Sequence, residues 1–347
     1  MKFNDTAAEY NFFSKGIQRR FRDIYNSGIF LFGKETSTLE RDFSRISGKK
    51  YNITVKNCTD AIMLVLKRVY KKGMPIILPN FGAYPTAVAC KNFTDNIFYI
   101  DVDWSMTIDP NKLPEDVKNG IIIPVHLFGN NCDMNRIMQY ATSNNHIVIE
   151  DCAQSTGSGS GKVGHYSVFS FYPTKPLASM GDGGMICCDN EEDCVYFKKI
   201  RFYGQHNSIV EMIGINSRMD EFQAAVINVK LDHFKSLNYK RISLATRYKK
   251  AVRGILDRGS VYHQFTVLFK KRGMVIDALK NKQIPYMIHY PNHLSEIDSL
   301  KGIYNKVEFR VDDKIVSFPI HPFLKEEEIE KVEGFLYDFR QFEYNSP

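Results

Sequence analysis

Short apolar runs alternate with helical patterns along the first half of the chain, and this alternation constrains the fold more than any other feature. Strands are predicted over residues 75–78, 97–100, 121–125 and 147–149, and helices over residues 60–70 and 135–143. Strands that are apolar throughout and separated by helices are typical of a parallel sheet covered on both faces. We therefore predict an α/β fold whose mostly parallel sheet is flanked by helices.

The second half of the chain changes character. Two more predicted strands, 167–171 and 185–188, flank a glycine-rich turn, and a long helical stretch follows over residues 220–248. The pattern shifts near Gly254 and closes with a helix over residues 325–339, whose first turn carries three glutamates that suit a helix N-terminus. We expect a large domain over residues 1–250, with an N-terminal arm, and a smaller α+β domain over residues 251–347.

Composition and charge exclude several classes of protein. The net charge of +7 is small for 347 residues and is spread along the chain, so we expect no nucleic-acid binding. No apolar run approaches the roughly 18 residues of a membrane-spanning helix, and the polar N-terminus lacks the apolar core of a signal peptide. The seven cysteines show no zinc-like spacing to histidine, which indicates reduced thiols, no metal site and a cytoplasmic protein.

Lys175 is the strongest candidate for a reactive residue. It lies on a turn between two predicted strands, ahead of Gly181-Asp182-Gly183-Gly184, and Asp151 ends a predicted strand upstream. Pyridoxal 5'-phosphate (PLP) chemistry requires such a pair, because the lysine forms a Schiff base and the carboxylate keeps the pyridine nitrogen protonated. Most lysines are solvated surface charges, but a half-buried lysine on this turn would have a lowered pKa.

Phosphate binding requires backbone donors at a helix start together with hydroxyl groups. The segment Asn57-Cys58-Thr59-Asp60-Ala61 precedes the first long predicted helix and offers both, and Ser170 is a second hydroxyl candidate. Asn and Thr caps also begin many helices that bind no ligand, so this signal is weak by itself.

Five further polar or aromatic residues have two interpretations each. Gln154 is a candidate for the ring oxygen of PLP or a surface amide, and Tyr84 or Phe81 is a candidate for stacking on the ring or for the core. Asn216 or Ser217 is predicted to cap the helix that follows. The same polar turn suits presentation across a dimer interface.

Taken together, these segments resemble the nucleotide-sugar aminotransferases of the DegT/DnrJ/StrS type, which are fold type I PLP-dependent transferases with the aspartate-aminotransferase-like fold. The resemblance runs from Ser27-Gly28 to the C-terminal helix. Its further segments are Pro124-Val125-His126-Leu127-Phe128-Gly129, Glu150-Asp151-Cys152-Ala153-Gln154, Ser170-Phe171-Tyr172-Pro173-Thr174-Lys175, Asn216-Ser217-Arg218-Met219-Asp220-Glu221, His289-Tyr290-Pro291 and Phe318-Pro319-Ile320-His321-Pro322. Many motifs in one order make the resemblance specific.

The resemblance implies a role for each matching residue. Lys175 would hold PLP covalently and move the proton, Asp151 would face the ring nitrogen and Gln154 the ring oxygen. The phosphate would be bound by Cys58, Thr59 and Ser170, with Asn216 reaching it from the partner subunit of a homodimer. The residues implied at the sugar nucleotide are Gly28, Phe30, Tyr290 and His293.

Two positions depart from the family pattern. Cys58 stands where the family usually has glycine, which leaves backbone donation intact if φ stays negative. The usual Thr-Phe pair that supplies the stacking ring is replaced around Gly82-Ala83-Tyr84. We expect Tyr84 to be the stacking residue.

The resemblance also implies the reaction. We expect a PLP-dependent aminotransferase that moves an amino group from L-glutamate to a keto-deoxyhexose carried on a nucleoside diphosphate, with pyridoxamine phosphate as the intermediate cofactor form. A 4-keto-6-deoxy sugar is the favoured acceptor, and a 3-keto sugar stays open. The alternatives are a sugar dehydratase on the same scaffold, in which histidine replaces the lysine, and a non-catalytic PLP-binding sensor.

Overall fold

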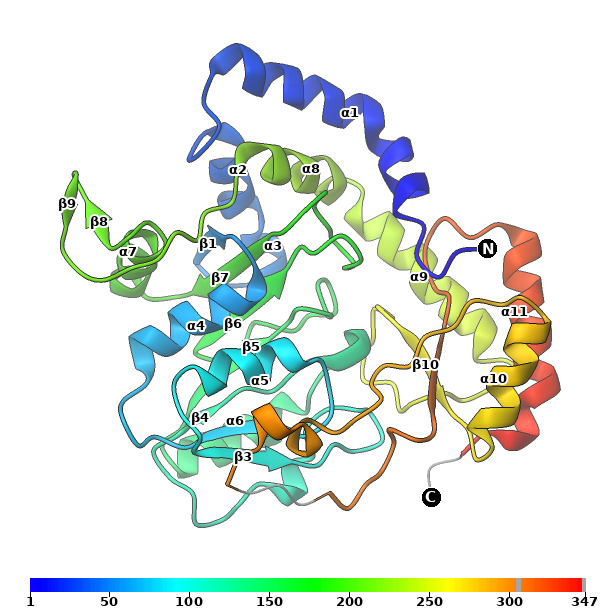
Figure 1. The fold of residues 1–347 in the computed structure, drawn as a ribbon. Helices are drawn as coiled ribbons and strands as arrows, with labels where there is room; N and C mark the ends of the chain where they lie inside the picture. Colours follow the sequence, from blue (N-terminus) through cyan, green and yellow to red (C-terminus); the bar gives the residue numbers. More distant parts are fainter. Residues whose placement is uncertain (304–306, 345–347) are drawn as a thin grey trace.

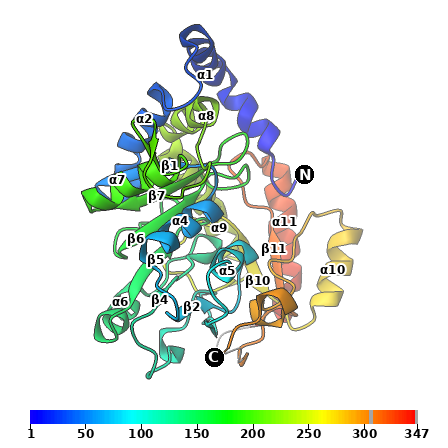
Figure 2. The same cartoon turned by 60° about the vertical axis from the view of Figure 1, so that its left-hand side comes forward.

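A seven-stranded sheet forms the centre of the molecule, and helices cover both of its faces (Figures 1 and 2). The computed structural model describes residues 1–303 and 307–344. The strands are β1 (Tyr51–Val55), β2 (Ile76–Pro79), β3 (Ile97–Ile100), β4 (Ile121–Ile122), β5 (Ile147–Asp151), β6 (Tyr166–Ser170) and β7 (Gly184–Cys188), in the order β1-β7-β6-β5-β4-β2-β3. In this sheet β7 alone runs in the direction opposite to the other strands. The prediction of a mostly parallel α/β sheet is confirmed.

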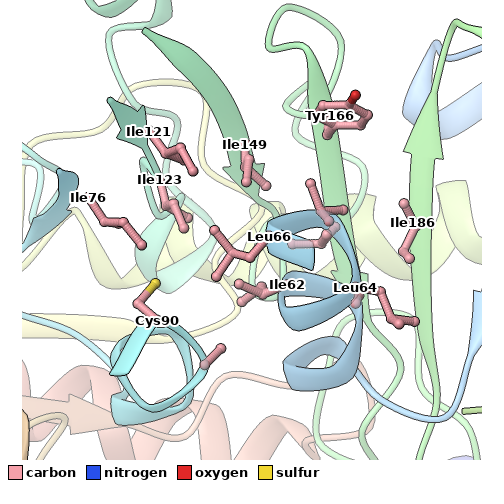
Figure 3. Packing of buried hydrophobic residues seen from close by; sticks show 14 of the residues in the cluster. Ile62, Leu64, Leu66, Ile76, Cys90, Ile121, Ile123, Ile149, Tyr166 and Ile186 are labelled. Atoms are coloured by element: carbon pink, nitrogen blue, oxygen red, sulfur yellow. The ribbon is translucent and has the colours of Figure 1, made fainter. Parts of the chain in front are cut away.

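The two faces of the sheet are covered by different helices. Side chains at Ile76, Ile121 and Ile149 pack with α4 (Cys58–Val69) and α5 (Tyr84–Lys91), as Figure 3 shows. The residues next to them, Ile77, Ile122 and Val148, pack on the other face with α6 (Met134–Ser143). Both faces are therefore apolar, which explains why these strands appear in the sequence as continuous apolar runs.

The N-terminal arm is a long helix, α1 (Thr6–Ser27), followed by α2 (Lys34–Asp42) and α3 (Ser44–Ser47). Helix α1 lies along α8 (Glu221–Leu231) and α9 (Phe234–Tyr248) in Figure 1. The helical stretch predicted over 220–248 consists of two helices, α8 (Glu221–Leu231) and α9 (Phe234–Tyr248), with a break at Asp232 and His233. The cap of α8 is Asp220, whose side chain accepts from the Gln223 N–H, so the predicted cap at Asn216 or Ser217 is wrong.

The C-terminal part has its own small sheet and core. The antiparallel strands β10 (Phe265–Leu268) and β11 (Ile315–Phe318) pack with α10 (Arg272–Asn281) and α11 (Glu326–Phe339). This core also includes Leu244 and Tyr248 from the end of α9. The division at residues 250 and 251 stays a prediction.

The connecting segments contain short elements. These are α7 (Glu191–Ile200), the hairpin of β8 (Gln205–His206) and β9 (Ile209–Val210), and the 3₁₀ helices Pro110–Lys112, Leu127–Gly129, Leu294–Glu296, Asp298–Leu300 and Arg340–Phe342. Across residues 1–303 and 307–344, no helix combines the length and the apolar character that a bilayer crossing requires.

Candidate active site

A cavity of about 520 Å³ lies at the carboxyl ends of the parallel strands. Its wall is made by residues that follow β1, β2, β4, β5 and β6, which is where open α/β sheets hold their ligands. Seven of the residues singled out from the sequence line this one cavity: Cys58, Thr59, Tyr84, Asp151, Gln154, Ser170 and Lys175.

Lys175 lies in the connection between β6 and β7. Its backbone N–H donates to the Tyr172 carbonyl oxygen at 2.9 Å, which fixes the turn that carries it. Burial lowers the pKa of the Lys175 amine, and the Asp151 carboxylate partly opposes this effect. A lowered pKa increases the neutral, nucleophilic fraction of the amine near neutral pH.

Asp151 ends β5, is buried, and is held by two hydrogen bonds. Its Oδ2 accepts from the Thr86 hydroxyl at 2.7 Å, and its Oδ1 accepts from the Ala153 N–H at 3.0 Å. Both bonds fix the orientation of the carboxylate. Its oxygens can still accept a hydrogen bond from a further N–H or O–H donor. The sequence did not indicate Thr86, whose only signal is its position in the first turn of α5, shortly after β2.

The start of α4 forms a third wall of the cavity. The Asn57 side chain caps this helix by accepting from the Asp60 N–H at 2.7 Å. A Cβ added at Gly184 would lie 2.4 Å from the carbonyl carbon of Asn57 and 2.8 Å from the Cys58 nitrogen, so only glycine permits this close approach. The positive end of the α4 dipole and its first N–H groups suit a phosphate.

Two hydroxyls and a thiol complete this side of the cavity. Ser170 and Thr59 line it, and the Ser170 Oγ accepts from the Tyr172 N–H at 3.3 Å. Burial raises the pKa of the Cys58 thiol well above its usual range, so the side chain stays a neutral thiol.

Tyr84 and Phe81 differ clearly in position. Tyr84 is the first residue of α5, lies on the cavity wall and is 62% exposed. Phe81 is fully buried in a separate apolar cluster with Leu127 and Phe128. Tyr84 is therefore the aromatic residue of this segment that can reach a ligand, and its stacking role stays a prediction.

Gln154 is buried at the cavity wall with both ends of its amide engaged. Its Oε1 accepts from the Phe128 N–H at 2.7 Å, and its Nε2 donates to the Tyr290 hydroxyl at 2.9 Å. The interpretation of Gln154 as a surface amide is therefore wrong.

Three residues that the resemblance assigns to the sugar nucleotide, Gly28, Phe30 and His293, do not line this cavity. Gly28 ends α1 in a left-handed conformation with φ 66°, and Phe30 stacks on Phe222 at 6.0 Å. His293 is fully buried, and its Nε2 donates to Asp312 at 3.1 Å. The assignment of His293 to the sugar nucleotide stays a prediction, and the burial of its ring could not be read from the sequence motif.

Asn216 lies outside the cavity wall of its own chain. Its side chain is exposed, and its Oδ1 accepts from Arg218 Nε at 2.9 Å. The neighbouring Ser217 is buried, and its Oγ donates to Asp60 at 2.7 Å and accepts from the Lys56 N–H at 3.1 Å. This turn is thus fastened to the start of α4.

A separate buried group, His126, Glu150 and Cys152, has the composition of a metal site. The His126 Nδ1 accepts from the Cys132 N–H at 3.0 Å, and its Nε2 donates to Glu150 at 3.0 Å. Glu150 also accepts three backbone N–H bonds, from Gly161, Val163 and Gly164. These bonds occupy the groups that would bind a metal, so the cluster serves the fold.

The cavity has the groups that PLP requires. A buried carboxylate, a half-buried amine and a helix N-terminus face one space, and each matches a different part of the cofactor: ring nitrogen, aldehyde and phosphate.

Known proteins share both the sequence and the fold. A family model described as the DegT/DnrJ/EryC1/StrS aminotransferase family matches residues 13–336. The chain is 32% identical over 343 residues to dTDP-3-amino-3,6-dideoxy-alpha-D-galactopyranose transaminase of Aneurinibacillus thermoaerophilus, covering 92% of this chain and 94% of that one. It is 31% identical over 331 residues to UDP-2-acetamido-2-deoxy-3-oxo-D-glucuronate aminotransferase of Pseudomonas aeruginosa, covering 89% and 90%. The crystal structure of NtdA from Bacillus subtilis with bound cofactor PMP superposes with a TM-score of 0.87 at 25% identity, covering 95% and 82%.

Proposed function

The chain belongs to the DegT/DnrJ/EryC1/StrS aminotransferase family, and we propose that it transfers an amino group from L-glutamate to a nucleotide-linked keto-deoxyhexose. The observation that supports this most is that Lys175 and Asp151 line one cavity beside the start of α4. The cofactor is PLP. When bound, it supplies an electron sink for removal of the α-proton of the amino donor.

The residues of the chain have distinct proposed tasks. Lys175 holds and moves a proton at its Nζ, for which its lowered pKa suits it. Asp151 binds the protonated ring nitrogen, which a carboxylate fixed by Thr86 and Ala153 can do without reorienting. Cys58, Thr59 and Ser170 bind the phosphate through backbone and hydroxyl donors. Tyr84 stacks on the ring.

The names of the two relatives bear on the acceptor. One product carries nitrogen at carbon 3, and the other substrate is a 3-oxo sugar. We therefore favour a 3-keto sugar over the 4-keto sugar that the sequence suggested first. The dehydratase alternative is disfavoured because this chain has Lys175 where sugar dehydratases on the same scaffold have histidine. The sensor alternative has no observation in its favour.

We also propose a homodimer in which Asn216 reaches the phosphate bound by the other subunit. Asn216 is exposed and does not line the cavity of its own chain. Large apolar side chains on the same segment are exposed as well, namely Ile209, Val210 and Ile213. Such a cluster is typical of a protein interface.

The test is to incubate the PLP-loaded protein with L-glutamate and a panel of dTDP- and UDP-linked 3-keto and 4-keto sugars. We expect an amino sugar nucleotide, identified by mass and by NMR of the aminated carbon, and no product with Lys175→Ala. Glutamate should also change the visible absorbance of the bound cofactor before any sugar is added. A protein that binds no PLP, or that aminates none of the sugars, would contradict the proposal.

A further inference from the structure

Three segments that are distant in the sequence meet at the Gln154 side chain. Phe128 comes from the 3₁₀ helix Leu127–Gly129, Gln154 from the turn after β5, and Tyr290 from the segment that returns from the C-terminal part to the large sheet. Four residues after Tyr290, this segment is bonded to the end of β2, because the Leu294 N–H donates to the Asn80 carbonyl oxygen at 2.8 Å.

The backbone N–H of Phe128 determines the positions of the oxygen and the nitrogen of the Gln154 amide. A backbone N–H is only a donor, so the amide atom 2.7 Å from it must be the oxygen. The reversed amide would place two donors against each other and leave a buried N–H unpaired. Nε2 therefore points away from Phe128, with one hydrogen bonded to Tyr290 and a second hydrogen available.

The ring of Tyr290 is held by packing that does not involve its hydroxyl. It lies parallel to the Phe128 ring, with centroids 6.2 Å apart and planes 9° apart, and meets the Phe81 ring at 6.1 Å and 69°. Both phenylalanines are fully buried. Burial raises the pKa of Tyr290 to about 12, so the hydroxyl stays neutral and can accept from Gln154 near neutral pH.

We propose that Tyr290 is a positioning residue, whose hydroxyl holds the Gln154 amide so that an Nε2 hydrogen faces the ring oxygen of PLP. This inference rests on the proposed function. It gives Tyr290 a different role from the contact with sugar nucleotide expected from the sequence. An anionic ring oxygen requires a donor, and the Phe128 N–H together with the Tyr290 hydroxyl ensures that Gln154 presents one.

The test is a double-mutant cycle of Tyr290→Phe, Gln154→Ala and the double variant. Two properties are measured: the Kd for PLP, by titrating the apoprotein, and the pH at which the visible absorbance of the bound cofactor changes. Tyr290→Phe should weaken PLP binding roughly threefold to tenfold, the value of one hydrogen bond. It should also move the absorbance midpoint to higher pH, because a donor that stabilises the anionic oxygen is no longer held in place.

The decisive comparison is between the effect of Tyr290→Phe in the wild type and its effect in Gln154→Ala. If Tyr290 acts through Gln154, then Tyr290→Phe has no further effect on either property in Gln154→Ala. The matched control is Tyr286→Phe, a half-buried tyrosine that packs on the C-terminal core and should leave both properties unchanged. Additive effects, or an unchanged Tyr290→Phe protein, would overturn the inference while the wild type still binds PLP. A wild type that binds no PLP would instead refute the proposed function.

Discussion

Asp151 is the residue whose surroundings determine most about the chemistry of the cavity. Replacing it with asparagine keeps the shape and removes the charge that would stabilise a protonated ring nitrogen. We expect Asp151→Asn to lower kcat roughly 100-fold, as loss of a preorganised electrostatic contact does, and to weaken PLP binding. Steady-state kinetics and titration of the apoprotein with PLP would measure both.

Thr86→Val is the matched comparison, because it removes only the hydroxyl that donates to Asp151 Oδ2. We expect a smaller loss of roughly threefold to tenfold, the value of one hydrogen bond. Equal losses in the two variants would argue that Asp151 serves the fold and not the cofactor.

The residues of the cavity were predictable from the sequence to different degrees. Lys175 and Asp151 lie in recognisable contexts, since one follows an apolar strand and the other ends one. Thr86 was not predictable, because its contact with Asp151 exists only once the start of α5 lies beside the end of β5. The burial of His293 was not predictable for a related reason, since its ring contacts Asp312 and Phe81 from other parts of the chain.

At the scale of elements, the close contact between β7 and α4 gives a second prediction. The Cβ of Gly184→Ala would lie within 2.6 Å of the Asn57 carbonyl oxygen, so the start of α4 must shift. We expect a loss of about 1–3 kcal/mol in unfolding free energy, as in other overpacked sites, and weaker PLP binding. Urea unfolding and PLP titration would measure these changes.

The control is Gly273→Ala in α10, where an added Cβ meets no atom within 4 Å. Alanine is the better helix residue by roughly 0.5–1 kcal/mol, so this variant should be no less stable than the wild type. A stable Gly184→Ala protein with unchanged PLP affinity would show that the approach of β7 to α4 is not needed.

A third prediction concerns how α1 is joined to the rest of the large domain. Lys230 of α8 is fully buried, and its Nζ lies 2.7 Å from Glu9 Oε1 of α1 and donates at 2.7 Å to the Ala178 carbonyl oxygen, just beyond Lys175. Glu9→Ala would leave a buried ammonium without its counter-charge. We expect a loss of about 3 kcal/mol in unfolding free energy, measured by urea unfolding.

The exposed pair of Lys282 and Asp338, 2.9 Å apart, provides the comparison. Asp338→Ala should cost less than about 1 kcal/mol, because surface ion pairs contribute little. If Glu9→Ala is no more costly than Asp338→Ala, the buried pair does not hold α1 in place.

The elements themselves were predicted with few errors where strands and helices have strong apolar patterns. The predicted strand over 97–100 has the observed bounds of β3, and the last helix differs from α11 by one residue at its start. The break between α8 and α9 was missed because both helices have apolar residues at helical spacing. The residues at the break, Asp232 and His233, are not strong helix breakers.

At the scale of the whole molecule, Lys175 should make stability depend on pH. The usual pKa of a lysine is 10.5, and burial lowers that of Lys175 in the folded protein. Between the two values the unfolded state binds a proton that the folded state does not, so unfolding free energy rises with pH in this window. Below the folded pKa the destabilisation is fully present, and it is lost as pH rises through the window.

Urea unfolding of the apoprotein at several alkaline pH values would measure this slope. The comparison is with Lys175→Met, in which the contribution of Lys175 is absent and the rise should be smaller. The exposed Lys280 gives the control, since Lys280→Met should behave as the wild type. Identical slopes in the wild type and Lys175→Met would contradict the prediction.

The reversed direction of β7 has one more consequence. Because β6 and β7 are neighbours that run in opposite directions, the segment carrying Lys175 starts and finishes at two anchor points about 5 Å apart, one strand spacing. Such a segment behaves as a cassette. Segments of other lengths from related enzymes could join the same two strand ends without a change in the order of the strands. The surroundings of the lysine can therefore be exchanged by grafting while the sheet stays intact.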